Sequence, residues 1–114
     1  MNKNQAILKN QLMPDSPNAE EDIVKSSVQL VHAVGMHARP AVKLTKLAKR
    51  FQSQIAMRVA GAADWIDAKS VAKVMALRAP RDSLIEVKAL GEDAEAAVAA
   101  LVDLIAADFP DTSS

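Results

Sequence analysis

The chain of 114 residues contains no cysteine and few aromatic side chains. Without cysteine, disulfide frameworks, thiol nucleophiles and cysteine-ligated zinc or iron–sulfur sites are excluded. The aromatic residues are one tryptophan and two phenylalanines, too few for a platform that stacks nucleic-acid bases. His32 and His37 are the only two histidines, so a three-histidine metal site is excluded as well. We therefore expect neither a metal ion nor a cofactor.

The chain also lacks an excess of charge of either sign and a long apolar run. Fourteen basic side chains balance 14 acidic ones, which gives a formal net charge of zero. Nucleic-acid binding by phosphate neutralisation needs a basic surplus, and a membrane span needs about 20 consecutive apolar residues. The N-terminal residues have no continuous apolar core of the kind found in a secretory signal. These absences predict a cytoplasmic protein that neither binds nucleic acid nor inserts into a membrane.

Composition divides the chain near residue 23. Residues 1–22 are rich in Asn, Gln, Asp and Glu, and we interpret them as a flexible N-terminal extension. An arm that contacts a partner or a second copy is the alternative. Residues 23–110 carry a continuous hydrophobic pattern and are predicted to form one compact domain. Residues 111–114 are predicted to be a short tail.

Hydrophobic periodicity predicts alternating strands and helices within this domain. The first helix has one apolar stripe, formed by Leu44, Leu47, Ala48 and Phe51. The complete prediction is strand 27–32, helix 39–51, strand 54–60, turn 61–64, short strand 65–67, a helix with Ser70 as N-cap that ends at Pro80, strand 84–90, and helix 93–108 stopped by Pro110. The order β-α-β-β-α-β-α predicts an α+β fold. We expect a two-layer sandwich with a four-stranded, mainly antiparallel sheet and three helices on one face.

The segment from Gly35 to Ala41, Gly-Met-His-Ala-Arg-Pro-Ala, is the most informative for function. Gly35 permits a tight reversal of the backbone, and Pro40 suits the first turn of a helix. The start of a helix binds anions through its amide N–H groups and its dipole. His37 and Arg39 are both expected at this helix start, so a nucleophilic ring and a planar cation converge on one small volume.

This arrangement suits a phosphorylated imidazole. Histidine is nucleophilic at neutral pH, and the helix start together with Arg39 would offset the charge of a phosphoryl group. The competing interpretation is that His37 is only a helix cap or a surface residue. His32 is predicted to be a histidine at the end of a strand, held by a hydrogen bond. The alternative is that its ring turns toward His37 and tunes the site.

Two blocks of sequence resemble the HPr family, the histidine-containing phosphocarriers of the bacterial phosphoenolpyruvate-dependent phosphotransferase system. The first is Gly35–Ala41, and the second is Asp67–Leu77, Asp-Ala-Lys-Ser-Val-Ala-Lys-Val-Met-Ala-Leu. The resemblance extends from Val28 to Phe109 and includes the predicted order of elements. It implies that phospho-enzyme I phosphorylates Nδ1 of His37 and that Arg39 stabilises the phosphoryl group. It also implies that Gly35, Ala38 and Pro40 shape the loop and helix start.

The resemblance further implies a docking patch for enzyme I and an EIIA-type acceptor. Its apolar members would be Met36, Ala41, Val42, Val71, Ala72 and Met75, and its basic rim would be Arg39, Lys46 and Lys49. On the second helix we expect Val74 and Leu77 inside, with Val71 and Met75 partly exposed. Ser70 matches the position that an HPr serine kinase/phosphorylase modifies in some members of the family. The alternative is that Ser70 only caps its helix.

These features favour a phosphoryl carrier rather than an independent catalyst. The carrier would serve sugar transport, the nitrogen-related branch or the dihydroxyacetone kinase branch. The segments Gly35–Ala41 and Asp108–Asp111 both resemble the nitrogen-branch paralogue. A non-transferring regulatory binding module with the same fold is the main alternative. A histidine-dependent phosphatase is a third possibility, but no carboxylate that could act as its general acid lies in the Gly35–Ala41 segment.

Overall fold

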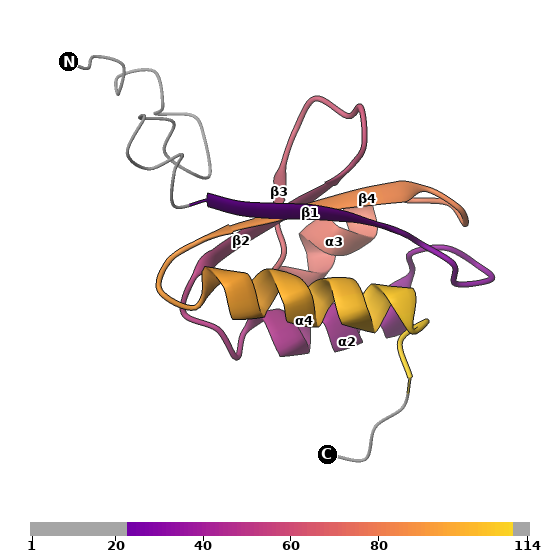
Figure 1. The fold of residues 1–114 in the computed structure, drawn as a ribbon. Helices are drawn as coiled ribbons and strands as arrows, with labels where there is room; N and C mark the ends of the chain where they lie inside the picture. Colours follow the sequence, from indigo (N-terminus) through magenta and orange to yellow (C-terminus); the bar gives the residue numbers. More distant parts are fainter. Residues whose placement is uncertain (1–22, 111–114) are drawn as a thin grey trace.

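The chain forms a β-sheet with helices packed on one of its faces, as Figure 1 shows. The computed structural model describes residues 23–110. Residues 1–22 and 111–114, and with them the predicted extension and tail, lie outside the described residues. The elements are β1 (Ile23–Gln29), α2 (Ala38–Ala48), β2 (Gln54–Val59), β3 (Ile66–Asp67), α3 (Val71–Ala76), β4 (Leu84–Leu90) and α4 (Ala94–Ala106).

The four strands lie in the order β1-β4-β2-β3, and every neighbouring pair is antiparallel. The last long strand, β4, is central and pairs with β1 from Ile23↔Leu90 to Gln29↔Leu84. Its other edge pairs with β2 from Gln54↔Leu90 to Val59↔Ile85. This topology confirms the predicted α+β sandwich and the antiparallel sheet.

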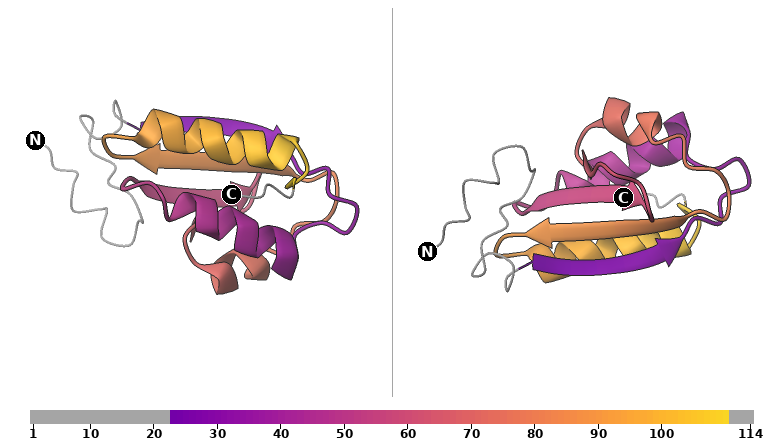
Figure 2. Two further views of the ribbon diagram at one scale, coloured as in Figure 1. Left: turned by 90° about the horizontal axis from the view of Figure 1, so that it is seen from below. Right: turned by 90° about the horizontal axis from the view of Figure 1, so that it is seen from above.

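The hydrophobic core lies between the sheet and the helices. Side chains of a strand alternate between its two faces, and β4 accordingly buries Ile85, Val87 and Ala89 against the helices. Viewed from below in Figure 2, α2 lies between α4 and α3. Leu44 of α2 and Leu101 of α4 are almost completely buried. Each such side chain contributes about 1.5–3 kcal/mol through burial, so the core fixes the position of α2, the helix in which the Gly35–Ala41 segment ends.

The opposite face of the sheet is polar, as the alternation predicts. Nε of Arg58 donates to Oε1 of Glu86 at 2.6 Å, across the β2–β4 pair. The ring of Trp65 lies within cation–π distance of three positive groups: Arg58 at 4.6 Å, Lys88 at 4.3 Å and Lys25 at 5.6 Å. These contacts cover the indole without a second layer of helices.

Asp93 ties the start of α4 to the loop before β2. Its carboxylate accepts from the amide N–H groups of Gln52 (2.8 Å) and Ser53 (2.9 Å) and from the Ser53 hydroxyl. The Ser53 hydroxyl and the Gln52 amide hold the pKa of Asp93 below its ordinary value. The ionised carboxylate is therefore the form that the folded chain favours.

The first strand differs most from its predicted boundaries. The prediction placed it at 27–32, but β1 covers Ile23–Gln29. Its early residues Lys25, Ser26 and Ser27 are exposed, so they give only a weak apolar pattern, and pairing with β4 decides their conformation. After Gln29 the chain leaves the ladder, and His32 consequently lies in a loop rather than in a strand.

The predicted helices are also longer than the observed ones. The first helix ends at Ala48 instead of residue 51, and the last covers Ala94–Ala106 instead of 93–108. The second ends at Ala76, well before Pro80, because Arg78 adopts a left-handed conformation with φ of 49°. Strand 84–90 is confirmed as predicted, and β2 and β3 lie within the predicted hairpin. Among residues 23–110, no helix is long and apolar enough to cross a membrane.

Candidate functional site

The loop between β1 and α2 approaches the loop after α3. Gly35 has φ of +75°, a left-handed conformation that glycine adopts readily. The next amide, that of Met36, donates to the carbonyl oxygen of Ala79 at 2.8 Å. A Cβ on Gly35 would lie only 2.5 Å from that same oxygen. Gly35 is therefore required both for the turn and for the close approach that places the start of α2.

His37 is the N-cap residue of α2 by its backbone. Its φ of −146° and ψ of −166° are extended, and its carbonyl accepts from the amide of Ala41 at 2.9 Å. Its side chain makes no capping hydrogen bond to the helix. The interpretation of His37 as a simple cap is therefore wrong for its side chain. The half-buried imidazole remains available for chemistry at the helix start.

The first turn of α2 contains Ala38, Arg39 and Pro40, as the sequence predicts for a helix start. Pro40 is buried and lacks an amide N–H, whereas Ala38 and Arg39 are exposed. A helix provides no internal acceptors for its first amides, and its dipole is positive at this end. The start of α2 thus offers an electropositive environment directly beside His37.

The His32 ring faces His37, so the interpretation that it turns toward the site is confirmed. The two Nε2 atoms lie 3.1 Å apart, and the ring centroids are separated by 5.1 Å. On its other side, Nδ1 of His32 lies 2.8 Å from Oδ1 of Asp108. The ring of Phe109 packs edge-on against His32, with centroids 5.9 Å apart. A hydrogen-bonded row therefore runs from Asp108 through His32 to His37.

The chain that follows α4 also contributes to the site, which its local sequence pattern does not predict. Asp108 and Phe109 both have positive φ, 65° and 52°. Their backbone turns toward α2, and Nζ of Lys43, in the middle of that helix, donates to the carbonyl oxygen of Phe109 at 3.0 Å. The only signal in the sequence is Pro110, which marks the end of the helix but not the direction in which the chain leaves it.

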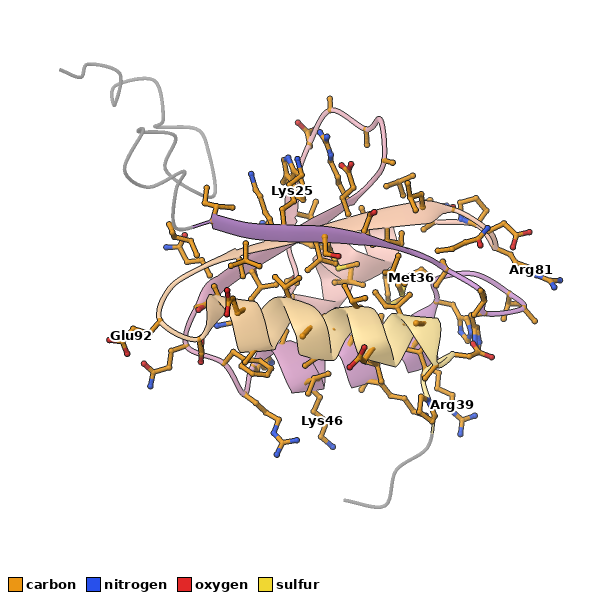
Figure 3. The ribbon with its side chains drawn as sticks, viewed as in Figure 1. Lys25, Met36, Arg39, Lys46, Arg81 and Glu92 are labelled. Atoms are coloured by element: carbon orange, nitrogen blue, oxygen red, sulfur yellow. The ribbon has the colours of Figure 1, made fainter. Side chains whose placement is uncertain are left out.

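The predicted docking patch needs one correction. Met36 is 6% exposed and Ala41 is fully buried, so neither forms part of an accessible surface. Both side chains face the core because the start of α2 packs toward the sheet, and Figure 3 shows Met36 between the two layers. The other members of the patch are exposed or half-buried: Arg39, Val42, Lys46, Lys49, Val71, Ala72 and Met75. On α3, Val74 is buried and Met75 exposed as expected, whereas Leu77 is only half-buried.

Ser70 caps α3, as its sequence position predicts. Its hydroxyl oxygen accepts from the amide of Lys73 at 3.2 Å. The side chain is half-buried. Ser70 thus has a structural role that needs no modification.

Comparison with known proteins shows which family the chain belongs to. Residues 24–107 match the family model described as the PTS HPr component phosphorylation site. The chain belongs to the HPr family. It is accordingly a phosphocarrier protein of the phosphotransferase system, and other proteins of that system are its partners in general terms.

Curated members of the HPr family cover the described domain almost completely. The phosphocarrier protein NPr of Escherichia coli strain K12 is 35% identical over 86 residues, which span 75% of this chain and 94% of NPr. The phosphocarrier protein HPr of Cupriavidus necator is 37% identical over 87 residues, 76% of this chain and 96% of that HPr.

Solved HPr structures share the fold. The crystal structure of HPr-C-His from Thermoanaerobacter tengcongensis is 31% identical, with a TM-score of 0.71 over 78% of this chain and 98% of that chain. The HPr from Bacillus anthracis is 32% identical, with a TM-score of 0.67 over 73% and 96%. The predicted HPr-like order of strands and helices is therefore confirmed.

Proposed function

We propose that His37 is the residue that carries the phosphoryl group, on Nδ1. One observation supports this above all: an imidazole that caps nothing lies at the start of α2 and uses Nε2 for its contact with His32. Nδ1 is then the ring nitrogen left for phosphorus. Histidine is a competent nucleophile near neutral pH.

The donor in this proposal is phospho-enzyme I. The lone pair of His37 Nδ1 attacks phosphorus, a new N–P bond forms, and the N–P bond to the donor histidine breaks. The electron pair of the broken bond returns to the donor ring. An EIIA-type protein then takes the phosphoryl group from His37 by the same exchange. The chain thus acts in the cytoplasm as a carrier and completes no net reaction alone.

Arg39 and the start of α2 offset the negative charge of the phosphoryl group. A helix dipole contributes about 0.3–1 kcal/mol to an anion at this end, and a guanidinium adds charge-assisted hydrogen bonds. This modest stabilisation suits a carrier, because a group that is held too tightly would not be passed on.

The test is phosphorylation of the full chain by purified enzyme I with phosphoenolpyruvate and Mg²⁺. Intact-mass spectrometry at mildly basic pH should find one acid-labile phosphoryl group on the native chain and none on His37→Ala. His32→Gln serves as the matched histidine control and should still be labelled. If active enzyme I from the same organism leaves the native chain unlabelled, the chain is instead a regulatory binding module with the HPr fold.

The partner-docking surface in this proposal lies over α2 and α3. Val42 and Met75 are large apolar side chains with 47% and 40% exposure. Arg39 and Lys46 extend from the helix layer on the side away from the sheet (Figure 3), and Lys49 follows at helical spacing. A flexible methionine surrounded by cations suits several partners with acidic rims.

The docking surface is tested by placing a negative charge on it. Met75→Glu should slow transfer from phospho-enzyme I, because the new carboxylate repels an acidic partner. Ala63→Glu adds the same charge in the exposed turn between β2 and β3, which Figure 1 shows on the side of the sheet away from α2 and α4. Equal transfer rates for these two variants would contradict the assignment of the surface.

Ser70 is proposed as a regulatory site where an HPr serine kinase/phosphorylase is present. A phosphate there would add roughly −1.5 to −2 charges at the start of α3, in a helix that also carries Val71, Ala72 and Met75. It would oppose the docking of acidic partners.

A further inference from the structure

His32 and Asp108 extend the site beyond the helix start. Oδ1 of Asp108 lies 2.8 Å from Nδ1 of His32, and Nε2 of His32 lies 3.1 Å from Nε2 of His37. The three side chains come from three places: the loop after β1, the N-cap of α2 and the turn that follows α4. They form an unbranched row of hydrogen-bonding groups that ends at Nδ1 of His37.

The chemistry of these groups determines where the protons lie. An ionised carboxylate only accepts hydrogen bonds, so Nδ1 of His32 must donate to Asp108. A neutral imidazole has one donor and one acceptor nitrogen, and Nε2 of His32 is therefore the acceptor. It faces Nε2 of His37, which must carry its proton toward His32. The lone pair of His37 is consequently on Nδ1.

We propose that His32, oriented by Asp108, is a positioning residue that holds His37 as the Nε2–H tautomer and exposes the Nδ1 lone pair to phosphorus. This rests on the proposed function of His37 as the phosphoryl carrier. Attack by Nδ1 gives the His37 ring a positive charge, which the Nε2–H group shares with His32 and, beyond it, with the carboxylate. When the group leaves, the N–P electron pair returns to Nδ1 while Nε2 keeps its proton. His37 therefore departs as neutral imidazole.

The backbone turn after α4 explains how Asp108 reaches His32. Asp108 and Phe109 are consecutive residues other than glycine with left-handed φ. Helices commonly end with a residue in this conformation directly after the C-cap. The amides of Asp108 and Phe109 donate to the carbonyl oxygens of Ile105 (3.1 Å) and Leu104 (2.9 Å), the pattern of a helix C-terminal turn. The Lys43 ammonium on the Phe109 carbonyl and the edge-on packing of Phe109 hold this turn beside His32. The same turn brings the carboxylate to His32.

The test compares the native chain with His32→Gln and His32→Phe. The glutamine carbonyl can still accept from Nε2–H of His37, whereas phenylalanine keeps an aromatic ring against Phe109 and has no acceptor. We expect phosphorylation by phospho-enzyme I to be about tenfold to a hundredfold slower in His32→Phe, the effect of losing one hydrogen bond to a charged group. His32→Gln should stay within about threefold of the native rate.

A spectroscopic measurement separates this role from simple packing. Long-range ¹H–¹⁵N NMR spectra of the imidazoles identify the tautomer of each ring, and the chain has only two histidines. In the native chain we expect a proton on Nδ1 of His32 and on Nε2 of His37. Asp108→Ala should remove the tautomer preference of His32 and slow phosphorylation.

The outcomes distinguish the inference from the proposed function. No label on the native chain refutes the function of His37 itself. A labelled native chain with equal rates in all variants refutes the positioning role alone. Equal losses in His32→Gln and His32→Phe would also overturn it, since packing rather than an acceptor would then explain the effect.

Discussion

Replacing Gly35 by alanine isolates the contact that places the candidate site. Gly35 and Gly61 are both left-handed, with φ of +75° and +89°. A Cβ on Gly35 would lie 2.5 Å from the carbonyl oxygen of Ala79 and 3.1 Å from Cα of Pro80, whereas a Cβ on Gly61 would meet nothing within 4 Å. Gly61→Ala is therefore a matched control with the same conformational strain and no collision.

The expected loss of folding stability in each variant follows from these contacts. A left-handed alanine costs about 1–2 kcal/mol, and the reduced entropy of the unfolded chain returns about 0.4–1 kcal/mol. Gly61→Ala should therefore destabilise the fold by no more than about 1.6 kcal/mol. In Gly35→Ala, the Ala79 carbonyl must also move from its 2.8 Å hydrogen bond with the Met36 amide. The lost bond contributes about 1 kcal/mol, and the collision adds about 1–3 kcal/mol.

Urea denaturation followed by circular dichroism measures the difference. Gly35→Ala should be less stable than Gly61→Ala by about 2–4 kcal/mol, which is at least about 8 °C in Tm for a domain of this size. Phosphorylation of His37 should also slow in Gly35→Ala alone, because the loop that leads to α2 has moved. Indistinguishable stabilities of the two variants would refute the argument that the loop after α3 leaves no room at Gly35.

Three further predictions concern side chains outside that contact. Hydrogen bonds lower the pKa of Asp93 in the folded chain. The stability that this carboxylate contributes is therefore fully present above the ordinary pKa of 3.8 and is lost as pH falls through the lower pKa of the folded state. Across this acid range, the urea midpoint should fall less for Asp93→Ala than for the native chain. Leu44 is completely buried, so Leu44→Ala should lower the free energy of unfolding by about 2–5 kcal/mol in the same assay, and a cost typical of a surface residue would contradict its place in the core. Ser70→Ala should cost about 1 kcal/mol through loss of the cap. Ser70→Asp should keep the cap but slow transfer from phospho-enzyme I, and equal transfer by both Ser70 variants would argue against regulation by charge at this position.

Local signals in the sequence were enough to locate the helix start that carries His37. Gly35, Pro40 and Ser70 act on neighbours within one helical turn, so their positions predict the reversal, the first helical turn and the N-cap without knowledge of the fold. Alternation along residues 84–90 predicted the central strand for the same reason, because each side chain alternates with its immediate neighbours.

Contacts between distant parts of the chain needed the tertiary structure. The burial of Met36 and Ala41 depends on which side of α2 packs toward the sheet, which their own residue types do not specify. Lys25, Ser26 and Ser27 belong to the first strand because β4 supplies their pairing partners, although these three residues show little apolar pattern.

The sequence by itself determined the fold class, the family and the position of His37 at a helix start. Only the tertiary structure decided that His32 faces His37 and that Asp108 orients His32. Asp108 is separated from His32 by 76 positions, and the packing of α4 on the sheet brings the two together. A local sequence pattern reflects the conformational preferences of adjacent residues. Which distant side chains form a hydrogen bond depends instead on how the helices and strands pack together.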